Sequence, residues 1–233
     1  MDAAGNRAEQ QRRYFFEPLL ALCGGSLHGR RVLDARCGEG FWSLQALAAG
    51  AEAVLGIDED AAAVEAARLR ALQAGADPAR LRFEQAPVPG AAVEGRYDVA
   101  LCIGLMERSA KPVELFEMLS GAGAELVVID SEVSGAPSSF FELSLAADGA
   151  LALLPSREAV VELAAEFGFD CMPLAHEMSS YEGLADYLAQ RRVAFLCASR
   201  ASLEELEWEQ EPPVTPWWRA LLDPSQRGWQ IPS

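Results

Sequence analysis

The chain has 233 residues, 51% of them apolar, and its 35 acidic and 19 basic residues give a formal net charge of −16. This length suffices for one sizeable core, and the excess of acid makes nucleic acid an unfavourable partner, because phosphate backbones are repelled. Two histidines, and five cysteines without a Cys-x-x-Cys pair, argue against a metal site, and we expect all five thiols to be reduced. Because no stretch resembles a signal peptide or an apolar membrane span, we expect a cytoplasmic protein that contacts no membrane.

A regular alternation of strands and helices follows an expected helical cap over residues 1–29. Short apolar runs predict strands at 31–35, 53–58, 81–86, 97–104 and 125–130, and helical spacing predicts helices at 41–50, 59–75 and 111–123. This alternation, with right-handed crossovers, predicts an α/β fold with a doubly wound, Rossmann-like sheet covered by helices on both faces. Ligands of such sheets bind beyond the carboxyl ends of the strands, near the reversal of strand order.

The alternation is interrupted after residue 130. Residues 131–155 form a long connection that we expect to be a lid or insertion, because structureless loops of this length are uncommon. A helix at 156–169 with Ser156 as N-cap, strands at 171–176 and 191–199, and a helical piece at 181–190 complete a domain of residues 30–200. The tail, residues 201–233, is first acidic and then rich in proline and tryptophan. We expect it to dock on the domain, on a partner or on a second copy of the chain, because exposed tryptophan is costly.

Two glycines and two aspartates form the first pattern with chemical meaning. Gly38 and Gly40 follow a strand and precede a helix, so the backbone can approach a ligand closely and the helix offers it free N–H groups. Asp34 ends the strand before them, and Asp58 ends the next strand, where a carboxylate can accept hydrogen bonds from both ribose hydroxyls. Asp58 is equally suited to cap the helix that follows. A dehydrogenase fingerprint is not complete, because Ser43 stands where a third glycine is required.

These residues belong to a longer stretch with a recognisable pattern. The segment VLDARCGEGFWSLQALAAGAEAVLGIDED, residues 32–60, resembles the first two motifs of class I S-adenosylmethionine-dependent methyltransferases. The segment RYDVALCIGLMERSAKPVELFEML, residues 96–119, resembles the fourth-strand region of the same family. The resemblance covers about residues 30–200 and implies a seven-stranded mixed sheet that binds S-adenosylmethionine. The stretches GFWSL and LALLPSREAVVELAAEFGF are in addition similar to a branch of tRNA wobble-uridine modifying enzymes.

The resemblance also implies a role for each residue of the cofactor site. The loop would line the methionine moiety with Asp34, Ala35, Arg36, Cys37, Gly38 and Gly40. Asp58 would bind the ribose with Glu59 beside it, and the adenine would be covered by Gln85, Ala86 and Pro87. Cys102, Ile103 and Gly104 would pass beneath the cofactor.

Three residues depart from the family pattern. Arg36 replaces a glycine, Ala86 replaces an acid that often accepts from the adenine amino group, and Arg108 replaces a frequent histidine. Arg36 permits three interpretations. Cofactor binding is lost, or the guanidinium pairs with a carboxylate of the methionine moiety or of an acidic acceptor, or the side chain turns away and pairs with Glu39 or another surface acid. A positive φ at this position would strain an arginine.

Candidates for catalysis are less specific, since methyl transfer requires positioning and only in some cases a base. They are Glu107, Arg108, Glu132, Glu142 and His176, and each is equally compatible with a solvated surface position. Tyr14 and Phe15 can cap the acceptor pocket, although we prefer packing of their helix on the core.

The sequence thus predicts an S-adenosylmethionine-dependent methyltransferase without a metal. Its acceptor is unknown, and a small molecule is preferred because of the acidic balance. A non-catalytic binding or scaffold protein of the same fold is the first alternative, and a tRNA-modifying methyltransferase is the second.

Overall fold

The computed structural model describes residues 3–145, 149, 151–175, 178 and 180–200. His176 and the tail at 201–233, with the docking predicted for that tail, lie outside the described residues. The helices are α1 (Ala3–Gln11), a π-helical segment (Arg12–Phe16), α2 (Glu17–Leu22), α3 (Phe41–Ala48), α4 (Ala61–Gln73), a 3-10 turn (Met106–Arg108), α5 (Pro112–Gly121), α6 (Arg157–Glu166) and α7 (Ala185–Leu188). The strands are β1 (Arg31–Ala35), β2 (Ala53–Asp58), β3 (Leu81–Gln85), β4 (Val99–Ile103), β5 (Leu126–Glu132), β6 (Phe141–Leu145), β7 (Leu151–Pro155), β8 (Phe169–Pro173) and β9 (Arg192–Ser199).

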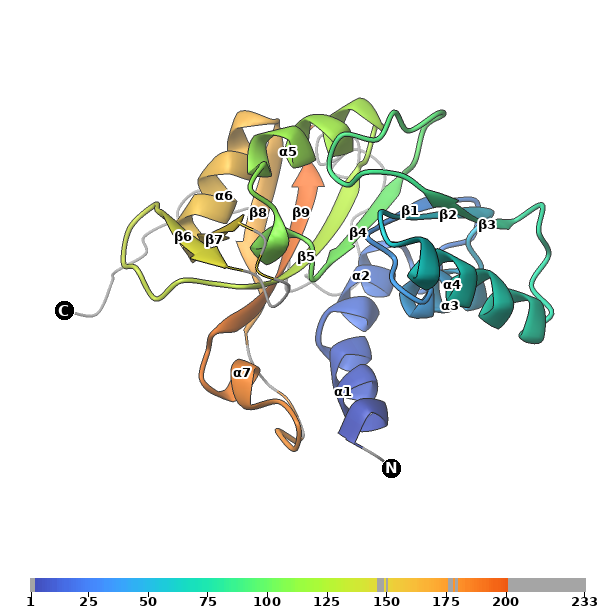
Figure 1. Cartoon of the computed structure of the whole chain (residues 1–233), viewed down its shortest axis with the longest axis horizontal. Coiled ribbons are helices and arrows are strands. Elements are labelled where there is room, and N and C mark those ends of the chain that lie inside the picture. The colour runs from blue at the N-terminus through green and yellow to red at the C-terminus, as the bar shows by residue number, and fades with distance from the viewer. Residues whose placement is uncertain (1–2, 146–148, 150, 176–177, 179, 201–233) are drawn as a thin grey trace. The chain divides into compact units, whose positions relative to one another are not determined.

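Seven strands form one mixed sheet in the order β3-β2-β1-β4-β5-β9-β8 (Figure 1). The first five of these are parallel neighbours, whereas β9 runs antiparallel to both β5 and β8. The strand order reverses between β1 and β4, which is the position where doubly wound sheets bind their ligands. The predicted seven-stranded mixed sheet is therefore confirmed, and the carboxyl ends of β1 and β4 locate the candidate site.

Helices cover both faces of the sheet, each over its own hydrophobic cluster. On one face α3 and α4 bury side chains such as Trp42 and Val64, and on the other α5 and α6 bury Phe116 and Val160 (Figure 1). β4 and most of β5 are buried on both faces, as the continuous apolar runs predict. Among the described residues, no helix has the length and apolar content that crossing a bilayer requires.

The N-terminal helices pack on this core. Tyr14 and Phe15 are both buried, and the Phe15 ring lies 4.9 Å from the ring of Trp42, measured between centroids. The Tyr14 hydroxyl donates to the backbone carbonyl of Leu174 at 3.0 Å. The preferred prediction for this segment, packing on the core, is confirmed.

Local capping signals account for two of the helix starts. Ser156 caps α6 as predicted, because its side chain accepts from the backbone N–H of Ala159 at 3.1 Å. Helix α4 begins two residues later than predicted, and its N-cap is Asp60, whose side chain accepts from Ala62 and Ala63. The alternative role of Asp58 as the cap of this helix is therefore wrong.

Two further expectations require correction, and a third becomes more specific. Residues 131–155, expected to be a lid or insertion, have regular structure, because β5 extends to Glu132 and β6 and β7 pair as an antiparallel hairpin separate from the seven-stranded sheet. The helix predicted at 181–190 is shorter, since α7 covers only Ala185–Leu188. Cys171 and Cys197 lie opposite each other in the β8–β9 register and form a disulfide, so the expectation of five reduced thiols is wrong for this pair.

Candidate functional site

The loop between β1 and α3 is organised around the carboxylate of Asp58. One Asp58 oxygen accepts from the backbone N–H of Gly38 at 2.8 Å, and the other accepts from the N–H of Asp60 at 3.0 Å. Gly38 and Gly40 both have positive φ, 53° and 78°, which glycine adopts without strain. Open space lies where a side chain of Gly38 would extend, whereas a Cβ on Gly40 would stand 2.8 Å from the ring of Phe83. The loop therefore presents bare backbone toward the edge of the sheet, and Gly40 is required for close packing.

Arg36 has a φ of 66°, one of two positive values at non-glycine residues in the described part of the chain. Its backbone N–H donates to the carbonyl of Ile57 at 2.8 Å, and its side-chain Nη1 donates to the carbonyl of Gly104 at 3.0 Å. Glu39 instead forms an ion pair with Arg70, so the predicted pairing of Arg36 with Glu39 is wrong. The guanidinium thus bridges the ends of β1 and β4, and its strained backbone conformation is typical of functional loops.

Asp34 lies buried beneath this loop. Its carboxylate accepts from the hydroxyl of Ser43 at 2.6 Å, which ties the end of β1 to the first turn of α3. Burial raises the pKa of Asp34 to about 7, although the bond from Ser43 opposes this shift. Asp34 therefore supports the loop from the protein interior, and its side chain is not accessible to a ligand on the solvent side of the loop.

The other residues expected around the cofactor line the same edge. The backbone N–H of Ala86 donates to the carbonyl of Asp58 at 2.9 Å, and the Gln85 side chain donates to the carbonyl of Glu59 at 3.2 Å. The β3 end is thereby held against the β2 end. Cys102 is fully buried, and its successors Ile103 and Gly104 are partly exposed at the end of β4.

A buried ionic network occupies the neighbouring part of the edge, at the ends of β4 and β5. Arg192 Nε donates to Asp130 at 2.8 Å, and its Nη1 donates to Glu107 at 2.9 Å. The side chains of these three residues are 8%, 0% and 9% exposed, in that order. The second oxygen of Glu107 accepts from the hydroxyl of Ser131 at 3.2 Å. Burial raises the pKa of Asp130, while the charge of Arg192 opposes that shift.

The N-terminal helices and α7 complete this network. The Tyr187 hydroxyl lies 2.8 Å from one oxygen of Asp130, and the side-chain amide of Gln11 donates to Tyr187 at 2.9 Å. Arg7 forms an ion pair with Asp186 at 2.7 Å on the outer side. Asp130 is thereby linked to segments 57 to 119 residues away in the sequence.

The structure separates the predicted catalytic candidates. Glu107 belongs to the buried network, whereas Arg108, Glu132 and Glu142 are exposed. The sequence does not single out Arg192, Tyr187 or Gln11 as site residues, and it places Asp130 only among the strand carboxyl ends where chemistry is expected. Their only signal in the sequence is the placement of Asp130 and Arg192 at strand ends, since Tyr187 and Gln11 lie in unremarkable polar stretches.

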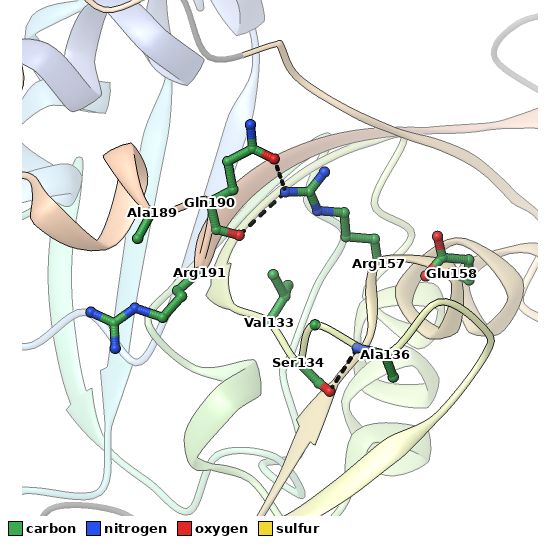
Figure 2. A pocket seen from close by; sticks show the side chains of 9 residues that line it. Val133, Ser134, Ala136, Arg157, Glu158, Ala189, Gln190 and Arg191 are labelled. Carbon is green, nitrogen blue, oxygen red and sulfur yellow. Dashed lines mark hydrogen bonds between the residues drawn. The ribbon is translucent and has the colours of Figure 1, made fainter. Parts of the chain in front are cut away.

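A pocket of about 360 Å³ lies beyond the end of β5, next to the network. Its walls come from three segments, the turn after β5, the start of α6 and the turn before β9: Val133, Ser134, Gly135, Ala136, Arg157, Glu158, Ala189, Gln190 and Arg191. Figure 2 shows the Arg157 side chain reaching toward Gln190, where its Nη2 donates to both the backbone and the side-chain oxygen at 3.2 Å. The Arg191 side chain extends away from Arg157 (Figure 2). Gln190 has the second positive φ, 54°.

Comparisons with known proteins agree with this geometry. Residues 32–129 match the family model described as a methyltransferase domain. The chain is 36% identical over 157 residues to the ubiquinone biosynthesis O-methyltransferase of Bordetella avium, which covers 60% of this chain and 62% of that protein. The chain thus spans about three fifths of the length of this curated relative.

Two solved structures have the same fold at low sequence identity. The 1,6-didemethyltoxoflavin-N1-methyltransferase of Burkholderia thailandensis has a TM-score of 0.61 at 20% identity, over 85% of this chain and 79% of that one. The magnesium protoporphyrin IX methyltransferase of Synechocystis has a TM-score of 0.59 at 18% identity, over 82% and 79%. The strand order and the loop at its reversal thus give the chain the fold of these methyltransferases, and residues 32–129 match their methyltransferase domain.

Proposed function

We propose that the protein is an S-adenosylmethionine-dependent O-methyltransferase with a small-molecule acceptor. The observation that carries the proposal is the bare Gly38 backbone held by Asp58 at the reversal of strand order, opposite Gly104. The relative named above is an O-methyltransferase, which supports a hydroxyl group as acceptor. The formal net charge of −16 favours a small molecule over a nucleic acid.

The residues present fit the cofactor. Each Asp58 oxygen already accepts one backbone N–H and retains capacity for a second hydrogen bond, so the carboxylate can hold two ribose hydroxyls. The open space over Gly38 leaves room for close approach to the backbone. When bound, S-adenosylmethionine supplies a methyl group on a positively charged sulfur.

Arg36 is proposed to hold the methionine carboxylate. Among the described residues, its guanidinium is hydrogen-bonded only through Nη1, to Gly104, so the remaining donors can form a charge-assisted bond to an anion. The strained φ of 66° is then the cost of placing a cation at this point of the loop. Of the three interpretations of Arg36, this arrangement supports the one in which the guanidinium pairs with a carboxylate.

Glu107 is proposed to accept the proton of the acceptor hydroxyl. Its two oxygens are held by Arg192 and Ser131, which fixes the orientation of the carboxylate and leaves one lone pair on each oxygen. The pocket shown in Figure 2 is proposed to hold the body of the acceptor, because it opens at the same edge of the sheet. Arg108 and Glu132, both exposed, are assigned no part in proton transfer.

Calorimetric titration of the full chain with S-adenosylmethionine and S-adenosylhomocysteine tests this proposal. We expect saturable binding of both, and release of S-adenosylhomocysteine when a hydroxylated acceptor from a small-molecule panel is supplied. Absence of binding at millimolar cofactor would overturn the proposal. In that case we would infer that Arg36 obstructs the cofactor site. The strained φ of Arg36 would then favour the alternative of a non-catalytic binding or scaffold protein.

A further inference from the structure

A second pocket, of about 400 Å³, lies at the opposite edge of the sheet. It is lined by residues in the first half of β1, β2 and β3 or just before β2, β3 and β4: Arg31, Glu52, Ala53, Val54, Leu55, Ala79, Arg80, Arg82 and Tyr97. Asp58 and the glycine loop lie at the carboxyl ends of the same strands. This pocket and the one shown in Figure 2 therefore lie at opposite ends of the strands, and this one takes no part in the function proposed above.

Two buried polar atoms in this wall have no hydrogen-bond partner among the described residues. They are Nε of Arg31 and the hydroxyl of Tyr97. Tyr97 is only 1% exposed, and the Arg31 guanidinium lies over its ring at 5.2 Å from the centroid. Burial of a donor without a partner costs free energy, so each such atom in a native protein requires an explanation, such as a bound water or ion.

The pocket is also positively charged in a strongly acidic protein. Arg31, Arg80 and Arg82 line it, and none of the three is in an ion pair with a carboxylate of the described part of the chain. Arg80 donates to the backbone carbonyls of Ala51 and Glu52, which fixes its guanidinium in the wall. The Glu52 side chain is exposed and is the one acidic member of the lining. Three guanidinium groups against one exposed carboxylate make the pocket suitable for an anion.

We propose that this pocket binds a small oxyanion, the carboxylate or phosphate group of a metabolite. Arg31 and Arg82 supply charge-assisted bonds, and the Tyr97 hydroxyl supplies a neutral one, so that the anion satisfies both orphaned groups. The pocket has a volume of about 400 Å³ at the amino ends of neighbouring strands, which suits a single small anion and not a polyanion. The formal net charge of −16 further opposes a polyanion.

The test is calorimetric titration of the full chain with sodium phosphate, and separately with sodium acetate, at constant ionic strength. Saturable binding of phosphate, of acetate or of both supports the proposal and identifies the preferred anion. We expect Arg82→Gln and Tyr97→Phe to weaken this binding by about tenfold and about threefold, as expected for one charged and one neutral hydrogen bond. Arg13→Gln removes the same charge from an exposed helical position and is the matched control.

Folding and the proposed cofactor site serve as separate readouts. Arg82 is exposed on an edge strand and Tyr97→Phe retains the ring, so neither change removes a packed group or a bonded one. Both variants are expected to keep the melting temperature without anion and to bind S-adenosylhomocysteine as the unmodified chain does. The proposal is overturned if neither anion binds saturably, or if the Arg13→Gln variant loses affinity as much as the Arg82→Gln variant.

Discussion

The carboxyl ends of the strands form two regions, one at β1 and β2 and one at β4 and β5. Each region contains a buried aspartate, and these two aspartates are stabilised in different ways. Asp34, under the cofactor loop, has the neutral Ser43 as its partner, nine residues away in the sequence. Asp130, at the end of β5, has the guanidinium of Arg192 as its partner, 62 residues away, and further bonds from Tyr187 and Gln11. The first site consists of one strand–loop–helix unit, whereas the second requires segments from the whole domain.

In the proposed function, the Asp34 half binds the cofactor and the Asp130 half positions Glu107. The Asp34 half is preformed by local sequence and suits a cofactor of constant shape. The Asp130 half holds Glu107 through Arg192, so its geometry depends on β9, α7 and the N-terminal helices together. Four experiments test this difference.

Replacing Arg192 by methionine has the largest expected effect. It leaves Asp130 and Glu107 buried without a cation, and breaking a buried ion pair in this way costs about 3–5 kcal/mol in the free energy of unfolding. Urea unfolding monitored by circular dichroism measures the loss. Arg7→Met is the control, because the Arg7–Asp186 pair is part-exposed and contributes less. Equal losses in both variants would contradict a special role for the network.

The pH dependence of the free energy of unfolding tests the half that contains Asp34. Because the folded state raises the pKa of Asp34 to about 7, folded protein binds one more proton than unfolded protein between the ordinary aspartate pKa and that value. This contribution is complete at low pH and is lost as pH rises, with a slope of up to about 1.4 kcal/mol per pH unit. Comparison of urea unfolding for the unmodified chain and Asp34→Asn, from about pH 4 to pH 7, isolates it. An unchanged slope in the variant would show that Asp34 does not carry this proton.

Replacing Asp58 by alanine is expected to weaken binding of S-adenosylmethionine by about a hundredfold, because two bonds to a charged group are lost. Glu65→Gln removes an exposed negative charge from α4 and is expected to change the affinity by less than about threefold. Isothermal titration calorimetry measures both. Similar losses in the two variants would mean that overall charge, and not the Asp58 geometry, controls binding.

Arg36→Gly has the smallest expected effect, a loss of cofactor affinity of about tenfold for one charge-assisted bond. Stability is expected to stay nearly constant, because relief of the positive φ and loss of the bond to Gly104 are each worth about 1 kcal/mol and oppose each other. Calorimetry and thermal unfolding on the same samples separate the two quantities. Tighter binding in the variant would instead identify Arg36 as an obstacle to the cofactor.

The cofactor half could be predicted from the sequence because its signals are local. Strand, glycine loop, helix and the acid at the end of β2 lie within 27 residues, residues 32–58, and Ser156 and the glycines reflect backbone preferences of single positions. The site at Glu107 could be predicted only as a candidate among others. Nothing near Glu107 in the sequence distinguishes it from Arg108, because its burial depends on Arg192 and Ser131.

Periodicity and turn residues thus predict the elements up to β5, the five parallel strands and the loop at the reversal of strand order, but not the β6–β7 hairpin. The antiparallel insertion of β9 between β5 and β8 depends on the tertiary structure. That pairing aligns Arg192 with Glu132 in the strand register and brings its guanidinium onto Asp130, and it sets Cys171 against Cys197. The physical reason is that strand register determines which side chains face each other across a sheet. Register depends on packing over the whole domain and not on residues adjacent in the chain.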